Sequence, residues 1–117
     1  MMSIERIGVA ARYSDAVIHN NTVYLAGHVP EASKGQDIAA QTRDVLAQID
    51  ETLRDCGTDK TKILTATIYL TSMTDFAGMN AVWDQWVAQG NTPARATVEA
   101  KLASPDYRIE IVMIAAR

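Results

Sequence analysis

One arginine and one glutamate are the side chains of this sequence best suited to chemistry. Residues 95–102 alternate as a strand does, and one face of that strand would carry Arg95, Thr97, Glu99 and Lys101. Glu110 lies in a second alternating segment, residues 107–115. Arginine offers a planar fork of donors to a carboxylate and stays charged at any working pH. Glutamate can orient or deprotonate a water molecule.

If both strands belong to one sheet, the face that carries Arg95 could lie on the same side as Glu110. The sequence alone does not fix which strand faces pair. The alternative is that both residues are solvated surface charges or form a simple cross-strand ion pair.

The other reactive side chains form no catalytic constellation in the sequence. The serines are isolated, and neither histidine has an acidic partner nearby in the chain. His28 follows a glycine at a strand end, where a ligand could approach. Cys56 ends an apolar helical stripe, so we expect it to pack rather than react. No spacing predicts a zinc site, and we expect Trp83 and Trp86 to be core or interface anchors.

The elements that must position Arg95 and Glu110 follow from periodicity and turn residues. We predict strands at 15–20 and 22–27 around an Asn-rich turn, a loop at 31–35, a helix at 36–56, a strand at 62–70, a helix at 75–89, and strands at 95–102 and 107–115. This order predicts a single α+β domain over residues 1–117, a mixed sheet with both helices on one face.

Apolar side chains at three- and four-residue spacings predict both helices. The first stripe comprises Ile38, Thr42, Val45, Leu46, Ile49, Leu53 and Cys56. Asp37 near the start suits the helix dipole, and Gly57 is a natural C-terminal stop. The second apolar face comprises Phe76, Met79, Trp83, Trp86 and Val87.

The last predicted strand places apolar side chains on the face of the sheet that the helices do not cover. Val112 and Ile114 would lie there, where a solvated face should be polar. Scattered surface hydrophobic residues are one explanation. The alternative that we favour for so short a chain is a neighbouring subunit that covers this face.

Composition excludes several classes of protein. Hydrophobic residues make up 48% of the 117 residues and charged residues 21%, which is typical of a packed globular domain. The net charge of −3 and the scattered cations argue against a nucleic-acid-binding surface. The single cysteine suits a reducing compartment. With no signal peptide and no apolar run long enough to span a bilayer, we expect a cytoplasmic protein.

Four blocks of the sequence resemble the RidA/YjgF (L-PSP) family of reactive intermediate deaminases. They are YSDAVIHNNTVYLAGHVP (13–30), DFAGMNAVW (75–83), PARATVE (93–99) and RIEIVMIA (108–115). The last three are similar to the family's D-F-A-x-x-N, P-x-R-x-x-V-E and K/R-I-E-I-x-x-I-A segments. Each block is weakly specific, but all four occur in the family's order.

The resemblance implies a chorismate-mutase-like α+β fold and a homotrimer with ligand clefts between subunits. It implies hydrolysis of imines and their enamine tautomers to 2-oxo acids and ammonia, as in 2-iminobutanoate/2-iminopropanoate deaminases. It implies no metal and no organic cofactor, and it implies a small carboxylate substrate.

Matching positions imply roles for individual residues. Arg95 would clamp the substrate carboxylate, and Glu110 would hold the attacking water. Tyr13 would close the cleft from the neighbouring subunit, and the backbone of Gly27 would line the pocket. Asn80 matches the family's helix asparagine, which supports the site.

Four departures from the archetype bear on the substrate. Ala26 replaces a serine, Thr97 replaces a cysteine, and Arg12 replaces a proline, while the loop at 31–35 is shorter. These features resemble the shorter-loop, YoaB-like branch of the family. Thr97 would still line the cleft, with altered polarity and volume.

Two other functions compete with deamination. A non-catalytic trimer could use the same clefts to bind small metabolites or to act like a chaperone, because an arginine clamp serves binding as well as turnover. Endoribonuclease or translation-inhibitor activity, a label that some family members bear, is disfavoured by the net acidity and by the lack of a paired-His or His/Lys constellation.

Overall fold

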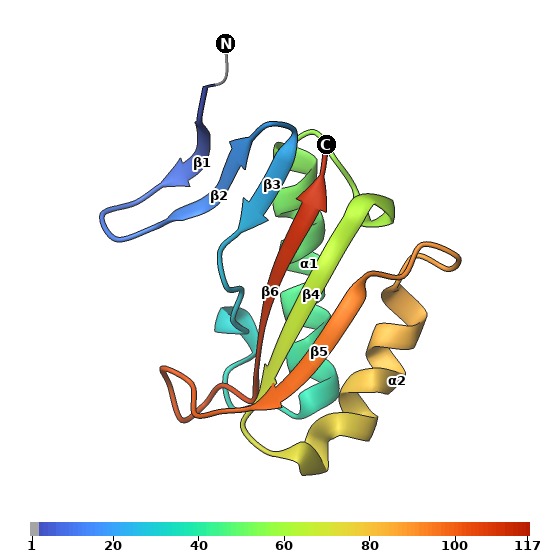
Figure 1. The fold of residues 1–117 in the computed structure, drawn as a ribbon. Coiled ribbons are helices and arrows are strands. Elements are labelled where there is room, and N and C mark those ends of the chain that lie inside the picture. Colours follow the sequence, from blue (N-terminus) through green and yellow to red (C-terminus); the bar gives the residue numbers. More distant parts are fainter. Residues whose placement is uncertain (1–2) are drawn as a thin grey trace.

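Six strands form one mixed sheet, and two helices pack against one of its faces (Figure 1). The computed structural model describes residues 3–117. Its elements are β1 (Glu5–Val9), β2 (Ser14–His19), β3 (Thr22–Leu25), α1 (Ile38–Asp55), β4 (Ile63–Leu70), α2 (Phe76–Trp86), β5 (Ala94–Glu99) and β6 (Ile109–Ala116). Short 3₁₀ turns lie at Glu31–Ser33, Lys60–Lys62 and Met73–Asp75.

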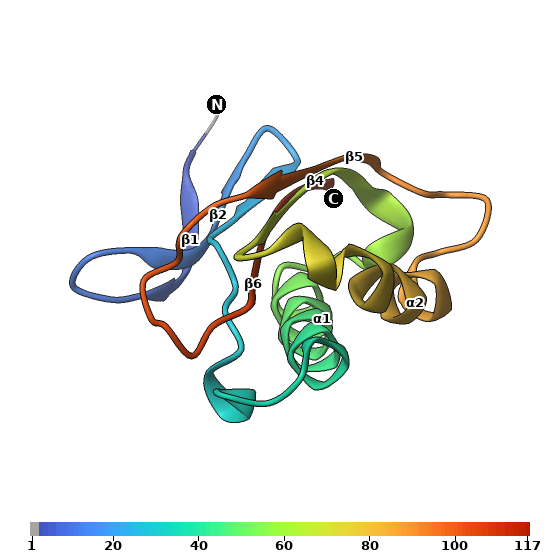
Figure 2. The same ribbon diagram turned by 90° about the horizontal axis from the view of Figure 1, so that it is seen from below.

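The strand order across the sheet is β1-β2-β3-β6-β4-β5. All neighbours are antiparallel except β4 and β5, which are parallel and are joined by α2 as a crossover. Figure 2 shows α1 and α2 side by side beneath the sheet. The predicted α+β arrangement with both helices on one face is therefore confirmed.

The core lies between the sheet and α1. Alternation in β6 buries Ile109, Ile111, Met113 and Ala115, as the sequence predicts. Helix α1 begins where the side chain of Asp37 accepts a hydrogen bond from the backbone N–H of Ala40. It ends at Asp55, and Gly57 follows the C-cap residue with a φ of 75°, in the left-handed region. The predicted start and stop of α1 are both confirmed.

Four features of the elements differ from the prediction, and one of them is that β5 ends at Glu99 rather than at residue 102. Strand β1 was not predicted, because most of its side chains are exposed and leave no alternating pattern. Helix α2 ends at Trp86 rather than at residue 89, since Val87 already has an extended backbone. Phe76 was expected on the apolar face of α2, but 40% of its surface is exposed.

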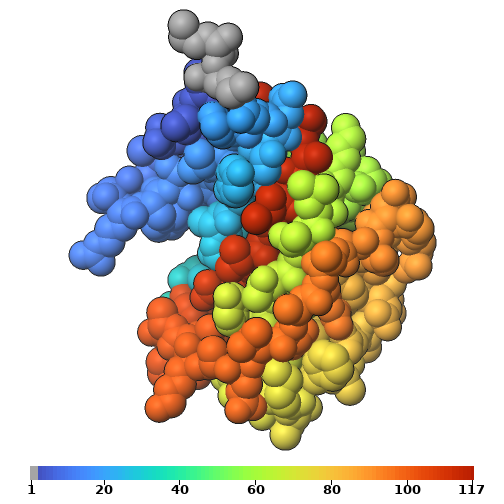
Figure 3. All heavy atoms as spheres, viewed as in Figure 1, coloured from blue at the N-terminus to red at the C-terminus, as the bar shows by residue number. Residues whose placement is uncertain are grey.

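The face of the sheet opposite the helices has no element packed on it within residues 3–117. Figure 3 views this side, where β3, β6, β4 and β5 lie next to one another. Val112 and Ile114 point to it and are half-buried, and Tyr24 and Val98 add exposed apolar surface. Neither α1 nor α2 has the length and apolar composition that crossing a bilayer requires, within the part of the chain that the structure describes.

Candidate functional site

Arg95 lies on the edge strand β5 and points toward α2. Its Nη1 donates a hydrogen bond of 2.8 Å to Oδ1 of Asn80. Its Cζ lies 5.2 Å from the ring centre of Trp83 and 6.0 Å from that of Phe76. A cation over aromatic faces is stabilised by the ring quadrupoles. The guanidinium is thus held in place, while the residue remains exposed.

A hollow of about 440 Å³ opens beside Arg95, lined by Met73, Phe76, Arg95 and Thr97. Thr97 Oγ1 is buried in this wall, and no residue of 3–117 hydrogen-bonds to it. A buried hydroxyl without a hydrogen-bond partner is uncommon in folded proteins. The hollow therefore combines a fixed cation with two apolar side chains, which suits a small carboxylate with an apolar part.

Met73 and Phe76 were not identified from the sequence as residues of the site. Met73 precedes α2 in a 3₁₀ turn, and its backbone N–H donates to Oε1 of Glu99 at 3.0 Å. This bond fixes the turn to the end of β5, beside Arg95. The exposure of Phe76 now has an explanation, because its ring forms part of the wall rather than part of the core.

Glu110 lies on the opposite face of the sheet from Arg95. In the register, Arg95 is level with Ala66, and Ala66 with Met113, so all three point to the helix side. Glu110 is level with Tyr69, which is an odd number of positions from Ala66 along β4. Because side chains alternate along a strand, Glu110 points to the open side of the sheet. The arrangement that the sequence left open, with Arg95 and Glu110 on one side of the sheet, is therefore not the one that the structure has. Within one chain they cannot act on the same molecule.

Glu110 lies against Gly27. A Cβ atom added to Gly27 would lie 2.2 Å from Glu110 Oε2 and 3.0 Å from its Cδ. Gly27 precedes His28, which bridges to Ile111 of β6 through two backbone hydrogen bonds. Because the φ of Gly27 is not in the left-handed region, the close approach of the Glu110 carboxylate is the feature that favours glycine here.

Tyr13 and Gly27 line a separate hollow of about 250 Å³ near the middle of α1. Tyr13 lies between β1 and β2 and is 61% exposed. The structure thus sorts the expected site residues into two groups. Asn80, Arg95 and Thr97 form one group at the β5 edge. In the other group, Gly27 lies against Glu110 and also lines a hollow with Tyr13.

His28 is engaged within the protein rather than free for a ligand. Its Nδ1 lies 2.8 Å from the carbonyl oxygen of Ala26, and its Nε2 lies 3.0 Å from Oγ1 of Thr52 on α1. Burial lowers the pKa of His28. The neutral ring joins the segment after β3 to α1, so His28 holds the backbone that carries Gly27 in position.

Cys56 packs at the end of α1, as expected. It is buried, and burial raises the pKa of its thiol, which keeps it protonated and unreactive. Among residues 3–117 there is no group of three or more His, Cys, Asp or Glu side chains placed to hold a metal ion.

The fold and the site define a class of small α+β proteins with a YjgF-like sheet. A crystal structure of a YjgF family member from Neisseria meningitidis matches this chain with a TM-score of 0.96 at 53% identity, covering 99% of this chain and 96% of that one. The family model described as "Endoribonuclease L-PSP" matches residues 3–117. The chain belongs to this family, known as YjgF, RidA, L-PSP or RutC.

Two relatives show how similar the chain is to different members of the family. The RutC family protein YoaB of Escherichia coli is 50% identical over 115 residues, which cover 98% of this chain and 99% of YoaB. A rat protein named 2-iminobutanoate/2-iminopropanoate deaminase is 32% identical over 108 residues, covering 88% of this chain and 78% of the rat protein. The expected resemblance to the YoaB-like branch is confirmed.

Proposed function

We propose that the protein is an imine deaminase that hydrolyses small 2-imino acids and their enamine tautomers to 2-oxo acids and ammonia. The family membership and the name of the rat relative support this activity. The observation that carries the proposal is Arg95, which is fixed by Asn80 and Trp83 at the rim of a hollow. A guanidinium held in this way can take a carboxylate in bidentate fashion without further ordering.

We further propose that each site is completed by two copies of the chain in a homotrimer. Arg95 and Glu110 point to opposite faces of one sheet, so a substrate can meet both only at an interface. The apolar open face with Val112 and Ile114 offers such an interface. One copy would supply Asn80, Arg95 and Thr97, and its neighbour would supply the rest of the site.

The neighbour's contribution would be Tyr13, Gly27 and Glu110. Tyr13 is exposed enough to reach across to another copy. The tight contact of Glu110 with Gly27 limits where the carboxylate can lie, which suits a residue that must hold one water molecule.

Imine hydrolysis requires the protein mainly to position the substrate and a water molecule. A protonated imine carbon is already electrophilic, so a water molecule held by Glu110 adds to it while the carboxylate takes up a proton from that water. Glu110 then returns this proton to the amine of the carbinolamine. The C–N bond breaks to release ammonia, and the carboxylate takes up the hydroxyl proton as the carbonyl forms. The products are a 2-oxo acid and ammonia. No side-chain nucleophile is needed, in accord with the lack of one in the sequence.

Mixing two inactive variants tests both the activity and the shared site. Arg95→Ala and Glu110→Ala should each fail to accelerate imine decay when the imine is supplied by a dehydratase and its amino acid. After the two are unfolded and refolded together in equal amounts, intact sites should form from the arginine of one chain and the glutamate of the other. Random assembly predicts about a quarter of the wild-type activity.

Separate refolding of each variant is the control. If the wild type accelerates the decay of no imine offered, the deaminase proposal is wrong and a binding-only trimer gains support. If the wild type is active but the mixture stays inactive, the shared site is wrong although the activity stands. Light scattering of the wild type gives the number of chains independently.

Asn80 is expected to act through Arg95. Asn80→Ala removes the acceptor for Nη1 and lets the guanidinium move, which should lower kcat/KM by about tenfold. The fall should lie mainly in KM, because the carboxylate clamp is loosened rather than lost. Asn80→Asp, which keeps an acceptor, should retain most of the activity. Equal losses in both variants would argue against a positioning role.

A further inference from the structure

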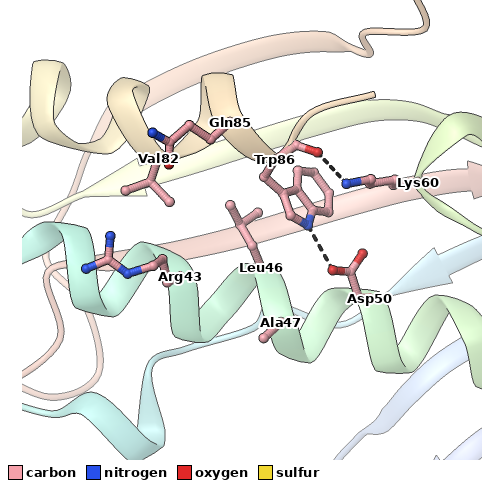
Figure 4. Close-up of a pocket in the computed structure, with 8 residues that line it drawn as sticks. All are labelled: Arg43, Leu46, Ala47, Asp50, Lys60, Val82, Gln85 and Trp86. Carbon is pink, nitrogen blue, oxygen red and sulfur yellow. Dashed lines mark hydrogen bonds between the residues drawn. The ribbon is translucent and has the colours of Figure 1, made fainter. Parts of the chain in front are cut away.

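A third hollow lies between α1 and α2, apart from the hollows beside Arg95 and Tyr13. Figure 4 shows it as a groove with a floor of Leu46 and Val82 and with Trp86 as one wall. Its volume is about 250 Å³. None of its lining residues lines the hollow beside Arg95 or the one beside Tyr13.

One end of this groove is a closed polar network around Trp86. The indole Nε1 donates to Asp50 Oδ2 at 2.9 Å, and Nζ of Lys60 donates to the backbone oxygen of Trp86 at 2.6 Å. The same Nζ lies 5.1 Å from the centre of the indole ring. Asp50 and Lys60 both contact Trp86 and hold its ring in a fixed orientation. This end is therefore a rigid apolar wall with its polar groups already paired.

The other end carries a charge without a counterpart. Arg43 is exposed, and no carboxylate of residues 3–117 lies within 4.0 Å of its guanidinium nitrogens. The positions four residues before and after it on α1 are Ala39 and Ala47, so the usual helical ion pair is absent. Gln85 faces Arg43 across the groove (Figure 4), where its side-chain amide can donate a further hydrogen bond.

We propose that this groove binds a small monocarboxylic acid with a branched or aromatic body. The carboxylate pairs with Arg43 and Gln85, and the body lies on Leu46 and Val82 against the face of Trp86. The charges support an anion, because the lining carries two cations, Arg43 and Lys60, but one anion, Asp50, and both Lys60 and Asp50 are already hydrogen-bonded to Trp86. The volume lies just below the range of about 300–1,000 Å³ typical of drug-sized ligands, which suits a smaller molecule.

The two tryptophans of the chain allow each site to be followed separately. Trp86 lines the groove, whereas Trp83 lies beneath Arg95, and their ring centres are 5.6 Å apart. A ¹H–¹⁵N spectrum of the ¹⁵N-labelled protein contains one indole N–H signal from each tryptophan. The signal that is lost in Trp86→Phe belongs to Trp86. Titration with 3-phenylpropanoate should move the Trp86 signal in a saturable way. The neutral 3-phenylpropanamide should bind at least tenfold more weakly.

Substitutions on α1 test whether Arg43 binds the carboxylate of the ligand. Arg43→Gln should weaken the binding seen at Trp86 at least tenfold, while Arg54→Gln, an exposed arginine of the same helix outside the groove, should leave it unchanged. Arg95→Ala should also leave the Trp86 shift intact, which separates this site from the proposed deaminase site. The inference is overturned if no saturable shift occurs, if the amide binds equally well, or if the shift depends on Arg95 instead of Arg43.

Discussion

Arg95→Ala is expected to lower kcat/KM for imine hydrolysis by about 10³-fold. A bidentate carboxylate contact comprises two charge-assisted hydrogen bonds, each worth about 1.5–3 kcal/mol. Loss of both takes away about 4 kcal/mol of transition-state stabilisation at a site where positioning is the main source of catalysis. The measurement is the rate of 2-oxo acid formation above the spontaneous rate.

Two further variants show what the guanidinium contributes. Arg95→Lys keeps the charge but loses the planar fork and the bond to Asn80, so it should recover only a small part of the activity. Arg54→Ala should behave as the wild type. Because Arg95 is exposed, its replacement should change the midpoint of thermal unfolding little. Full activity of Arg95→Ala, with every imine that the wild type hydrolyses, contradicts the proposed role.

Local patterns predicted most of the fold because they depend on neighbours in the chain. The stripe of α1, its Asp37 cap and the Gly57 stop are all read within a few turns of helix. The Asn20–Asn21 turn is also local, and both residues have the positive φ that such a hairpin requires. Strand β1 was missed because it is short and Ile7 is its one half-buried side chain, which leaves too little alternation to indicate a strand.

The relation between strands could not be predicted in this way. Alternation correctly separated the two faces of β5 and of β6, but it does not say which face of one strand lies beside which face of another. That choice is made by the register of both strands with β4. At the edge of a sheet, a polar face does not identify the side that is open to solvent. Arg95 points to the helix side and is nevertheless exposed.

The rest of the candidate site depends on contacts between distant segments. The unpaired hydroxyl of Thr97 and the wall made by Met73 appear only once α2 lies against β5. The contact of Gly27 with Glu110 joins residues from β6 and the segment after β3. Arg43 is different, since the alanines four positions before and after it were a sequence signal that an unpaired cation would be left on α1.

Gly27→Ala is the second change with a large expected effect, and it acts through Glu110. The new methyl group would lie 2.2 Å from Glu110 Oε2, so the carboxylate must move away. Displacement of a catalytic group by about 1 Å can reduce the rate about 10²-fold. We therefore expect kcat for imine hydrolysis to fall about 10²-fold, with KM changed less because the arginine clamp is untouched. Steady-state kinetics measures both.

Two comparisons separate this effect from loss of stability. Gly90→Ala adds a methyl group in open space at a φ of 79°, so it should lower the free energy of unfolding by about 1 kcal/mol and leave the activity intact. Gly27→Ala combined with Glu110→Ala should be no less active than Glu110→Ala alone, since the methyl group then has no carboxylate to displace. A further loss in the double variant would mean that Gly27 is needed for another reason, such as direct approach of the substrate to its backbone.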